Sequence, residues 1–356
     1  MSKELIMSQI IFYGINGIGL GHLARLSLVQ RHIEKKFPQH TTKAICRSSM
    51  GPIFFTCPCV EVGDRGRDLG NALNIRGVLG TLKLVVSRFI PNKRTTIFFD
   101  TMWHQRVLKR LHFGKHKTIL ITNVNKPEII YKDLQLALQY FEHIFIPATQ
   151  KELEFHYKDH PKLWELLKNK KCKAAGPFVR LTETSNQDEK VIFTLGGGGD
   201  HHNEGPKYSV QGYLEQFIKA AHKLSDAGLT NLYLAKGPLM DINIDLGPLK
   251  VLETMNLPEH FGPNTTVVTR GTYNLTWEAI AQGAKLVTTE RSTVLDEYAE
   301  SRNEFLEQEG YAYYAKLDGE KLANAILKET PKNLSAGQNL IMEQKGLQTV
   351  CAVITQ

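Results

Sequence analysis

The chain has 356 residues, of which 42% are hydrophobic and 22% charged, and its formal net charge is +8. This composition excludes a disordered chain and indicates a folded protein with an extensive core, and the length suggests two domains of ordinary size. The positive charge favours an anionic partner, but a nucleotide sugar, an anionic membrane surface and a nucleic acid all satisfy it.

Five cysteines occur without regular spacing, which argues for a reducing compartment rather than for a framework of disulfides. Cys57 and Cys59 lack a second pair of ligands, so we expect no metal there. The first residues, MSKELIMSQIIFYG, show no apolar stretch followed by a cleavage site, and no run reaches the roughly 20 apolar residues that a membrane span needs. We therefore expect an unprocessed cytoplasmic protein.

The segment from Ile10 to Tyr13 has the pattern of a buried strand and leads into a glycine-rich loop and an apparent helix. Strand, glycine loop and helix predict the start of a doubly wound α/β domain. The loop lacks the G-x-G-x-x-G spacing of a dinucleotide site, so NAD binding is disfavoured. Glycines let the backbone approach a ligand closely, and those expected to do so are Gly17, Gly19 and Gly21.

His22 follows this loop at the carboxyl edge of the expected sheet, where open α/β sheets bind ligands. It is a candidate to exchange a proton near neutral pH, and the alternative is that it caps the helix. Later strands place Asp100, His104 and Asn123 at the same edge. Asp100 and His104 are candidates to orient an acceptor, with a simple role in a turn as the alternative.

Residues 78–90 are apolar with two interspersed cations. We expect a buried or domain-packing helix here. The alternative is a helix that touches the inner face of a membrane or a lipid-bearing acceptor.

A polar, turn-rich segment over residues 180–189 predicts a linker. The strand expected at 190–195 then runs into four glycines, and a helical pattern follows over 211–224. The second half thus repeats the strand, glycine loop and helix order of the first half. Gly197 and Gly198 are expected to approach a ligand.

The most informative stretch is VVTRGTYNLTWEAIAQGA, residues 267–284. A strand end, the turn Arg270-Gly271-Thr272 and a helix from Leu275 to Gln282 follow one another. The N-terminus of such a helix attracts phosphate through its amide groups and its dipole. Glu278 lies one turn into the helix and suits two adjacent sugar hydroxyls, because its carboxylate only accepts hydrogen bonds. The alternative is an ordinary αβ unit with a solvated glutamate.

We therefore expect a first Rossmann-like domain over 1–179, the linker, and a second Rossmann-like domain over 190–340. A last helix is expected near 336–349, and the segment 341–356 is expected to pack back on the first domain.

Four segments of the chain together resemble the GT-B glycosyltransferases: FYGINGIGLGHLAR (12–25), GPFVR (176–180), FTLGGGGDH (193–201) and TRGTYNLTWEAIAQGAKLV (269–287). The likeness is closest to the branch of the bacterial N-acetylglucosaminyltransferase that completes the peptidoglycan lipid precursor, and to a group of uncharacterised predicted bacterial glycosyltransferases. The resemblance implies two facing doubly wound domains with a cleft between them. It also implies sugar transfer from a nucleotide sugar, usually UDP-linked, to an acceptor hydroxyl, with inversion and without a bound metal.

By this resemblance, Glu278 holds the ribose hydroxyls and Glu297 takes the place of an acidic residue that reads the sugar. His22 is the first candidate to accept the proton of the acceptor hydroxyl, with Asp100 and His104 in reserve. Other residues implied to line the donor are Gly197, Gly198, Arg270, Gly271, Thr272, Tyr273 and Asn274. The loop after the strand near 286–288 departs from the family, so the transferred sugar is left open.

Two other functions remain beside a sugar transferase. One is a nucleotide-sugar hydrolase or epimerase on the same fold, which would use the same donor site. The other is a nucleic-acid-binding protein, which is disfavoured because the Lys and Arg residues are scattered rather than interleaved with aromatic residues along a stripe. The sequence does not identify the acceptor, which is left open as a small molecule, a lipid-linked molecule or a glycan.

Overall fold

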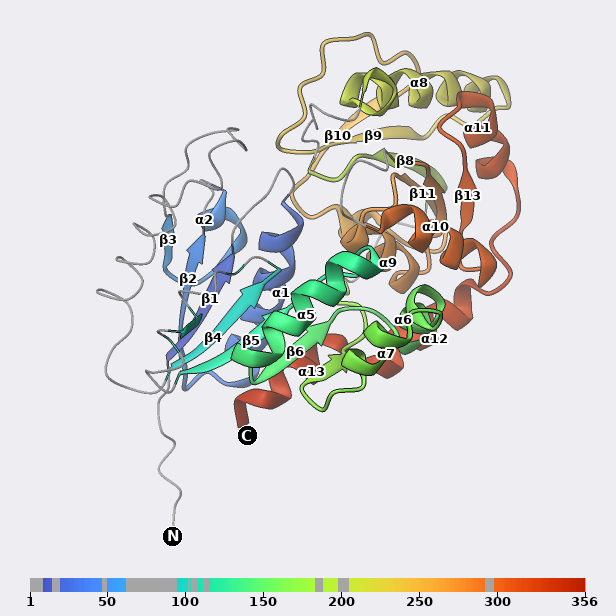
Figure 1. Ribbon diagram of the computed structural model, residues 1–356. Coiled ribbons are helices and arrows are strands. Elements are labelled where there is room, and N and C mark those ends of the chain that lie inside the picture. The colour runs from blue at the N-terminus through green and yellow to red at the C-terminus, as the bar shows by residue number, and fades with distance from the viewer. Residues whose placement is uncertain are drawn as a thin grey trace. The chain divides into compact units, whose positions relative to one another are not determined.

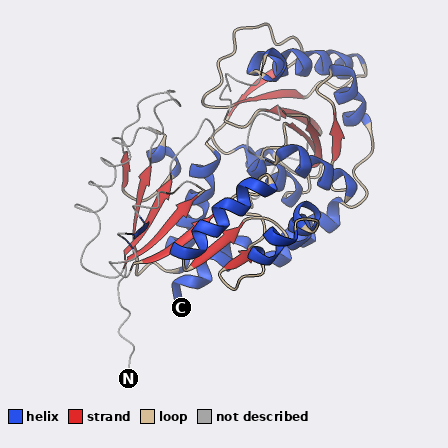
Figure 2. Cartoon of the chain, in the orientation of Figure 1, coloured by secondary structure: helices blue, strands red, loops and turns tan. Residues whose placement is uncertain are grey.

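The computed structural model describes residues 9–14, 20–46, 50–61, 95–101, 103, 108–109, 111, 116–182, 188–197, 205–291 and 298–355. The chain divides into two compact units (Figure 1). Unit 1 comprises residues 1–148, 157–176 and 346–356, and unit 2 comprises residues 149–156 and 177–345. Both units alternate strands with helices (Figure 2).

Unit 1 contains a seven-stranded parallel sheet in the order β3-β2-β1-β4-β5-β6-β7. The strands are β1 (Gln9–Gly14), β2 (Thr41–Cys46), β3 (Cys59–Glu61), β4 (Thr95–Asp100), β5 (Lys117–Ile121), β6 (His143–Ile146) and β7 (Cys172–Ala174). The helices are α1 (Gly21–Lys36), α2 (Gly51–Phe54), α5 (Pro127–Tyr140), α7 (Pro161–Leu167), α13 (Gly346–Cys351) and the 3-10 turn η5 (Ala352–Thr355). The central strands are apolar because they are buried on both faces, and Phe12 of β1 stacks on Phe98 of β4 with ring centroids 5.3 Å apart.

Unit 2 contains a six-stranded parallel sheet in the order β10-β9-β8-β11-β12-β13. The strands are β8 (Lys190–Thr194), β9 (Leu232–Lys236), β10 (Lys250–Glu253), β11 (Thr265–Thr269), β12 (Lys285–Thr289) and β13 (Tyr313–Ala315). The helices are α6 (Gln150–Tyr157), η3 (Pro206–Tyr208), α8 (Val210–Asp226), η4 (Leu257–His260), α9 (Tyr273–Ala281), α10 (Ala299–Gln308), α11 (Gly319–Leu327) and α12 (Leu334–Gln344). The two Rossmann-like α/β domains expected from the sequence are therefore confirmed.

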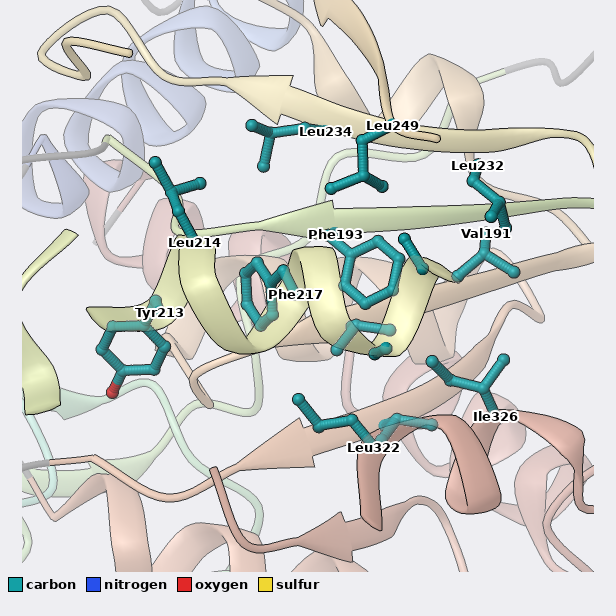
Figure 3. Packing of buried hydrophobic residues seen from close by; sticks show 14 of the residues in the cluster. Val191, Phe193, Tyr213, Leu214, Phe217, Leu232, Leu234, Leu249, Leu322 and Ile326 are labelled. Atoms are coloured by element: carbon teal, nitrogen blue, oxygen red, sulfur yellow. The ribbon is translucent and has the colours of Figure 1, made fainter. Parts of the chain in front are cut away.

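The core of unit 2 shows why the amphipathic pattern after the second glycine loop forms a helix. Helix α8 packs its apolar face on the sheet, where Phe217 lies against Phe193 of β8 with ring centroids 5.0 Å apart (Figure 3). Leu322 and Ile326 of α11 belong to the same buried cluster. Burial of these side chains holds α8 and α11 against the sheet of unit 2. The loops described below follow the carboxyl ends of the strands of this sheet.

Both sheets reverse their strand order at one point. In unit 1 the chain moves from β1 outward to β3 and then returns to place β4 on the other side of β1. In unit 2 it moves from β8 outward to β10 and then places β11 on the other side of β8. Ligands of doubly wound sheets bind outside the carboxyl ends of the strands at such a reversal. The loops after β1, β4, β8 and β11 therefore mark where a site is expected.

The end of the chain differs from the prediction of one helix near 336–349. The structure has α12 in unit 2 and α13 in unit 1, and Lys345 between them has a left-handed φ of 49°. A residue in this conformation interrupts the helical hydrogen-bond ladder, and Gly346 follows it. Helix α13 packs on α1, and the ammonium of Lys117 donates to the carbonyl of Val353 at 2.6 Å.

Candidate functional site

The reversal point of unit 1 carries a hydrogen-bonded group of polar and charged side chains. His22 is the second residue of α1, and Asp100 is the last residue of β4. Nδ1 of His22 lies 2.8 Å from Oδ1 of Asp100. Nε of Arg25, one helical turn after His22, donates to Oδ2 of Asp100 at 2.7 Å, and its Nη2 donates to Oδ1. Arg25 also donates through Nη1 to the side chain of Asn123, in the loop after β5.

The carboxylate of Asp100 is fully buried, yet its surroundings keep it charged. Burial by itself raises the pKa of Asp100, but the Arg25 guanidinium and the His22 ring outweigh burial and hold this pKa well below its ordinary value. The hydroxyl of Thr101 donates to Oδ1 at 2.9 Å. Thr101 has a left-handed φ of 57°, so the backbone turns sharply directly after the carboxylate.

This geometry orients the imidazole of His22. A carboxylate facing Nδ1 favours the tautomer that carries its proton there, which leaves the lone pair of Nε2 to accept a proton. The His22 side chain is 17% exposed, whereas Asp100 is 0% exposed. The arrangement therefore suits a general base that meets solvent or a substrate on one side and a buried carboxylate on the other.

The reversal point of unit 2 carries the β11–α9 turn, which we define as Arg270, Gly271 and Thr272. Gly271 has a left-handed φ of 69°, and a Cβ atom there would lie 2.2 Å from Oδ1 of Asn303. Only glycine fits this position without strain and displacement. Thr272 is the N-cap residue of α9, and the backbone amide groups at the start of that helix point toward the β11–α9 turn. The guanidinium of Arg270 lies 5.8 Å from the ring centroid of Tyr213 and adds a positive charge.

Three buried hydroxyl groups lie in the elements that meet at this edge. Thr269 ends β11, Thr276 lies in the first turn of α9, and Thr289 ends β12, and all three residues are 0% exposed. Among the residues that the structure describes, their hydroxyls have no hydrogen-bond partner. Buried polar groups are normally satisfied, so water or a polar ligand is expected to complete them.

Glu278 lies on α9 and is only 3% exposed. Burial raises the pKa of Glu278 to about 7, and the Arg180 guanidinium, whose Nε lies 3.9 Å from Oε1, offsets part of this effect. Arg180 is itself held by the side chain of Asn256. A carboxyl group with this pKa changes its charge near neutral pH, and in its ionised form both oxygens only accept hydrogen bonds, which suits a pair of hydroxyls.

The glycine loop after β8 is described up to Gly197. The carbonyl of Gly197 accepts from the amide of Leu239 at 3.0 Å. A Cβ atom on Gly237 would lie 2.2 Å from the carbonyl oxygen of Gly196, so the two loops pack backbone to backbone. A Cβ atom on Gly196 would come within 3.8 Å of Thr272, which places this loop beside the β11–α9 turn.

The structure brings together His22, Asp100 and Asn123 in unit 1. In unit 2 the predicted residues Arg270 to Asn274 form one turn and helix start, with Gly197 in the neighbouring loop and Glu278 one turn along α9. Gly21 is the exposed first residue of α1, where a Cβ atom would meet no described atom within 4 Å. Five predicted residues and the helix expected at 78–90 lie outside the described residues: Gly17, Gly19, His104, Gly198 and Glu297.

Sequence reasoning assigned no role to Arg25 or Arg180, although both lie in the quoted motifs. Arg25 stands three residues after His22, and this spacing places both on one face of a helix, so helical spacing could have identified Arg25 as a neighbour of His22.

In the described part of the chain, no group of three His, Cys, Asp or Glu residues has the geometry of a metal site. Within the same residues, no helix has the length and apolar character of a membrane span.

No family model matches this chain, and no curated protein matches it in sequence. Solved structures match it over nearly its whole length. The kitacinnamycin glycotransferase has a TM-score of 0.67 at 13% identity and covers 98% of both chains. CalG4, the calicheamicin glycosyltransferase, has a TM-score of 0.65 at 13% identity, covering 99% of this chain and 98% of its own. UGT71G1 of Medicago truncatula, solved with UDP-glucose, has a TM-score of 0.63 at 10% identity and covers 100% of both. The chain therefore has the GT-B fold of these glycosyltransferases, without a link to the peptidoglycan-precursor branch in particular.

Proposed function

We propose that the protein is a glycosyltransferase of the hexosyltransferase type that moves a sugar from a UDP-linked donor to an acceptor hydroxyl with inversion. The shared fold supports this proposal, because structures with that fold include enzymes solved with UDP or UDP-glucose. The two groups of side chains at the reversal points supply the chemistry that the reaction needs: a seat for a diphosphate and a general base.

The donor is assigned to unit 2. The diphosphate lies against the β11–α9 turn and the first turn of α9, where Arg270 and the backbone amides offset its negative charge. Glu278 in its ionised form accepts hydrogen bonds from the ribose hydroxyls. Because these groups stabilise the leaving diphosphate, the proposed reaction needs no metal and no permanently bound cofactor.

The acceptor is assigned to unit 1. Its hydroxyl oxygen attacks the anomeric carbon of the donor sugar while the bond from that carbon to the phosphate oxygen breaks. UDP leaves with the electron pair of that bond, and Nε2 of His22 takes the proton of the hydroxyl. Direct displacement inverts the anomeric centre. Asp100 stabilises the imidazolium that forms.

The single observation that carries this proposal is the 2.8 Å contact between Nδ1 of His22 and Oδ1 of Asp100. A protein that only binds a nucleotide needs no oriented base. A transfer to a hydroxyl group does need one, and the buried pair of Asp100 and Arg25 fixes the ring for that purpose.

The proposal is tested by UDP release from a panel of UDP-sugars, with and without simple sugar and phenolic acceptors. We expect release that depends on the acceptor, persists in EDTA and is lost in the His22→Ala variant. UDP and free sugar formed at the same rate without any acceptor would instead indicate a nucleotide-sugar hydrolase.

A further inference from the structure

Helix α6 belongs to unit 2 although its neighbours in the sequence belong to unit 1. It lies in the chain between β6 and β7, yet residues 150–156 pack within unit 2. Phe155 of α6 lies against Phe305 of α10, with ring centroids 5.4 Å apart. At the exposed end of the same contact, Lys151 forms an ion pair with Glu309. A segment from the first half of the chain is therefore part of the second unit.

The buried side of this contact holds a charged pair. Glu152 of α6 is 0% exposed and Arg302 of α10 is 3% exposed. Nε of Arg302 donates to Oε1 of Glu152 at 3.1 Å. Burying two charges is costly unless they are paired and hydrogen-bonded, so such a pair holds each partner in a narrow range of positions.

The other end of the Arg302 side chain reaches the β11–α9 turn. Its Nη1 donates to the carbonyl of Gly271 at 3.4 Å, and its guanidinium carbon lies 5.0 Å from the ring centroid of Tyr273. The next residue of α10, Asn303, donates to the carbonyl of Thr289 at 3.2 Å and fills the space beneath Gly271. Two consecutive residues of α10, Arg302 and Asn303, therefore contact the β11–α9 turn at Gly271.

Arg302 is matched by a negative charge within unit 2. Burial by itself raises the pKa of Glu152, but the His156 ring, whose Nε2 lies 3.8 Å from Oε1, and the charge of Arg302 outweigh burial and keep this pKa below its ordinary value. His156 in turn has Nδ1 2.8 Å from the hydroxyl of Ser301. Because Glu152 stays ionised, it balances the charge of Arg302. The contacts of Arg302 therefore favour a role in holding the turn over a role as a free cation that pairs with a ligand.

We infer that Arg302 is a positioning residue that holds the β11–α9 turn, and that Glu152, carried into unit 2 by α6, is the buried anion that holds Arg302. This inference rests on the proposed function of that turn as the seat of the donor diphosphate. It adds two residues, one from each half of the chain, to the machinery that shapes the donor site.

The test is hydrogen exchange of the full chain, read on a peptide that covers residues 269–276. The variants are Arg302→Lys, which keeps the charge but cannot reach Glu152 and Gly271 together, and Glu152→Gln, which keeps an acceptor but removes the charge. Lys151→Ala is the matched control, because it breaks the exposed ion pair between α6 and Glu309, the C-cap residue of α10. A peptide from α8 reports global stability.

We expect exchange in the 269–276 peptide to rise at least fivefold in Arg302→Lys and less in Glu152→Gln, while the α8 peptide and the Lys151→Ala variant match the wild type. Unchanged protection of the turn in Arg302→Lys would overturn the inference. An equal rise in both peptides would also overturn it, because it would show a role in overall stability alone.

A titration with UDP on the same variants separates this inference from the proposed function. We expect the dissociation constant of UDP to rise at least tenfold in Arg302→Lys and to stay within twofold in Lys151→Ala. UDP affinity that is unchanged in Arg302→Lys would count against the positioning role. If the wild type bound no UDP, the donor assignment would fail, while hydrogen exchange would still decide whether Arg302 holds the turn.

Discussion

His22 and Asp100 are 78 positions apart in the sequence, and Nδ1 of the histidine lies 2.8 Å from Oδ1 of the aspartate. The pair forms because β1 and β4 are neighbours in the sheet, with Gly14 beside Asp100 in register, and α1 starts soon after β1. In the proposed reaction, this contact orients His22 as the general base.

We expect Asp100→Asn to lower the rate of sugar transfer by about 10²- to 10⁴-fold, the usual contribution of general base catalysis. The amide can orient the ring in the wrong tautomer and does not stabilise the imidazolium. The dissociation constant of UDP, measured by calorimetry, should be unchanged because the pair lies in unit 1. A rate within threefold of the wild type would remove Asp100 from the mechanism.

Arg25→Met is expected to destabilise the protein by about 3–5 kcal/mol at pH 7, because it leaves the buried Asp100 carboxylate without its main partner. The matched control is Arg31→Met on the same helix, since Arg31 is an exposed residue that donates only to the carbonyl of Phe54 among the described groups. Urea unfolding of both variants measures the difference. Equal losses of stability would show that the Arg25–Asp100 pair contributes no more than a surface contact.

The Arg25–Asp100 pair also determines how the unfolding free energy changes at acidic pH. The folded-state pKa of Asp100 lies below the ordinary value of 3.8, so its contribution to stability is present above pH 3.8 and is lost as the pH falls through the folded pKa. Arg25→Met should flatten this part of the profile of unfolding free energy against pH.

Glu278 has the opposite response. Its folded-state pKa is about 7 and its ordinary value is 4.5, so the folded state holds more protons than the unfolded state between these values. The unfolding free energy contributed by this group therefore falls as the pH rises from 4.5 to 7. We expect Glu278→Gln to remove this fall in unfolding free energy between pH 4.5 and 7. At pH 8 the variant should be more stable than the wild type, by up to roughly 3 kcal/mol. If Glu278→Gln were less stable than the wild type at pH 8, the ionised Glu278 carboxylate would be stabilised in the folded protein, contrary to this expectation.

Gly271→Ala tests the shape of the β11–α9 turn. Alanine at a φ of 69° is strained, and its Cβ would also lie 2.2 Å from Oδ1 of Asn303. Gly228→Ala is the control, because that glycine has a φ of 92° but open space around it. We expect a loss of about 1 kcal/mol in the control from strain alone, and a larger loss in Gly271→Ala. Calorimetry should show weaker UDP binding only in Gly271→Ala, and equal UDP affinity in both variants would contradict the assignment of the turn.

Much of this site follows from local sequence patterns. A strand, a glycine loop and a helix locate His22, and the end of an apolar strand locates Asp100, because parallel sheets present these positions at one edge. Arg25 could have been added from helical spacing alone. The hydrogen bond from His22 to Asp100 could not be predicted from local patterns, because it depends on the long-range pairing of β4 with β1 rather than with β3.

Other features had no local signal. Glu152 has the sequence context of an ordinary residue on the surface of a helix, and only the packing of α6 in unit 2 buries it against Arg302. The break at Lys345 was missed because a lysine rarely adopts a left-handed conformation, so the prediction ran one helix through two. Both features arise where tertiary packing overrides local preference.

The placement of the nucleotide-sugar donor on α9 is tested by a titration of the protein with UDP, for the wild type and for Glu278→Ala. Thermal unfolding and calorimetry follow the titration. UDP at 100 times its dissociation constant should stabilise the wild type by about 2.7 kcal/mol, and Glu278→Ala should abolish this stabilisation. GDP and TDP serve as the comparison nucleotides. Failure of every nucleotide to stabilise the wild type, or full stabilisation of Glu278→Ala by UDP, would contradict the placement of the donor on α9.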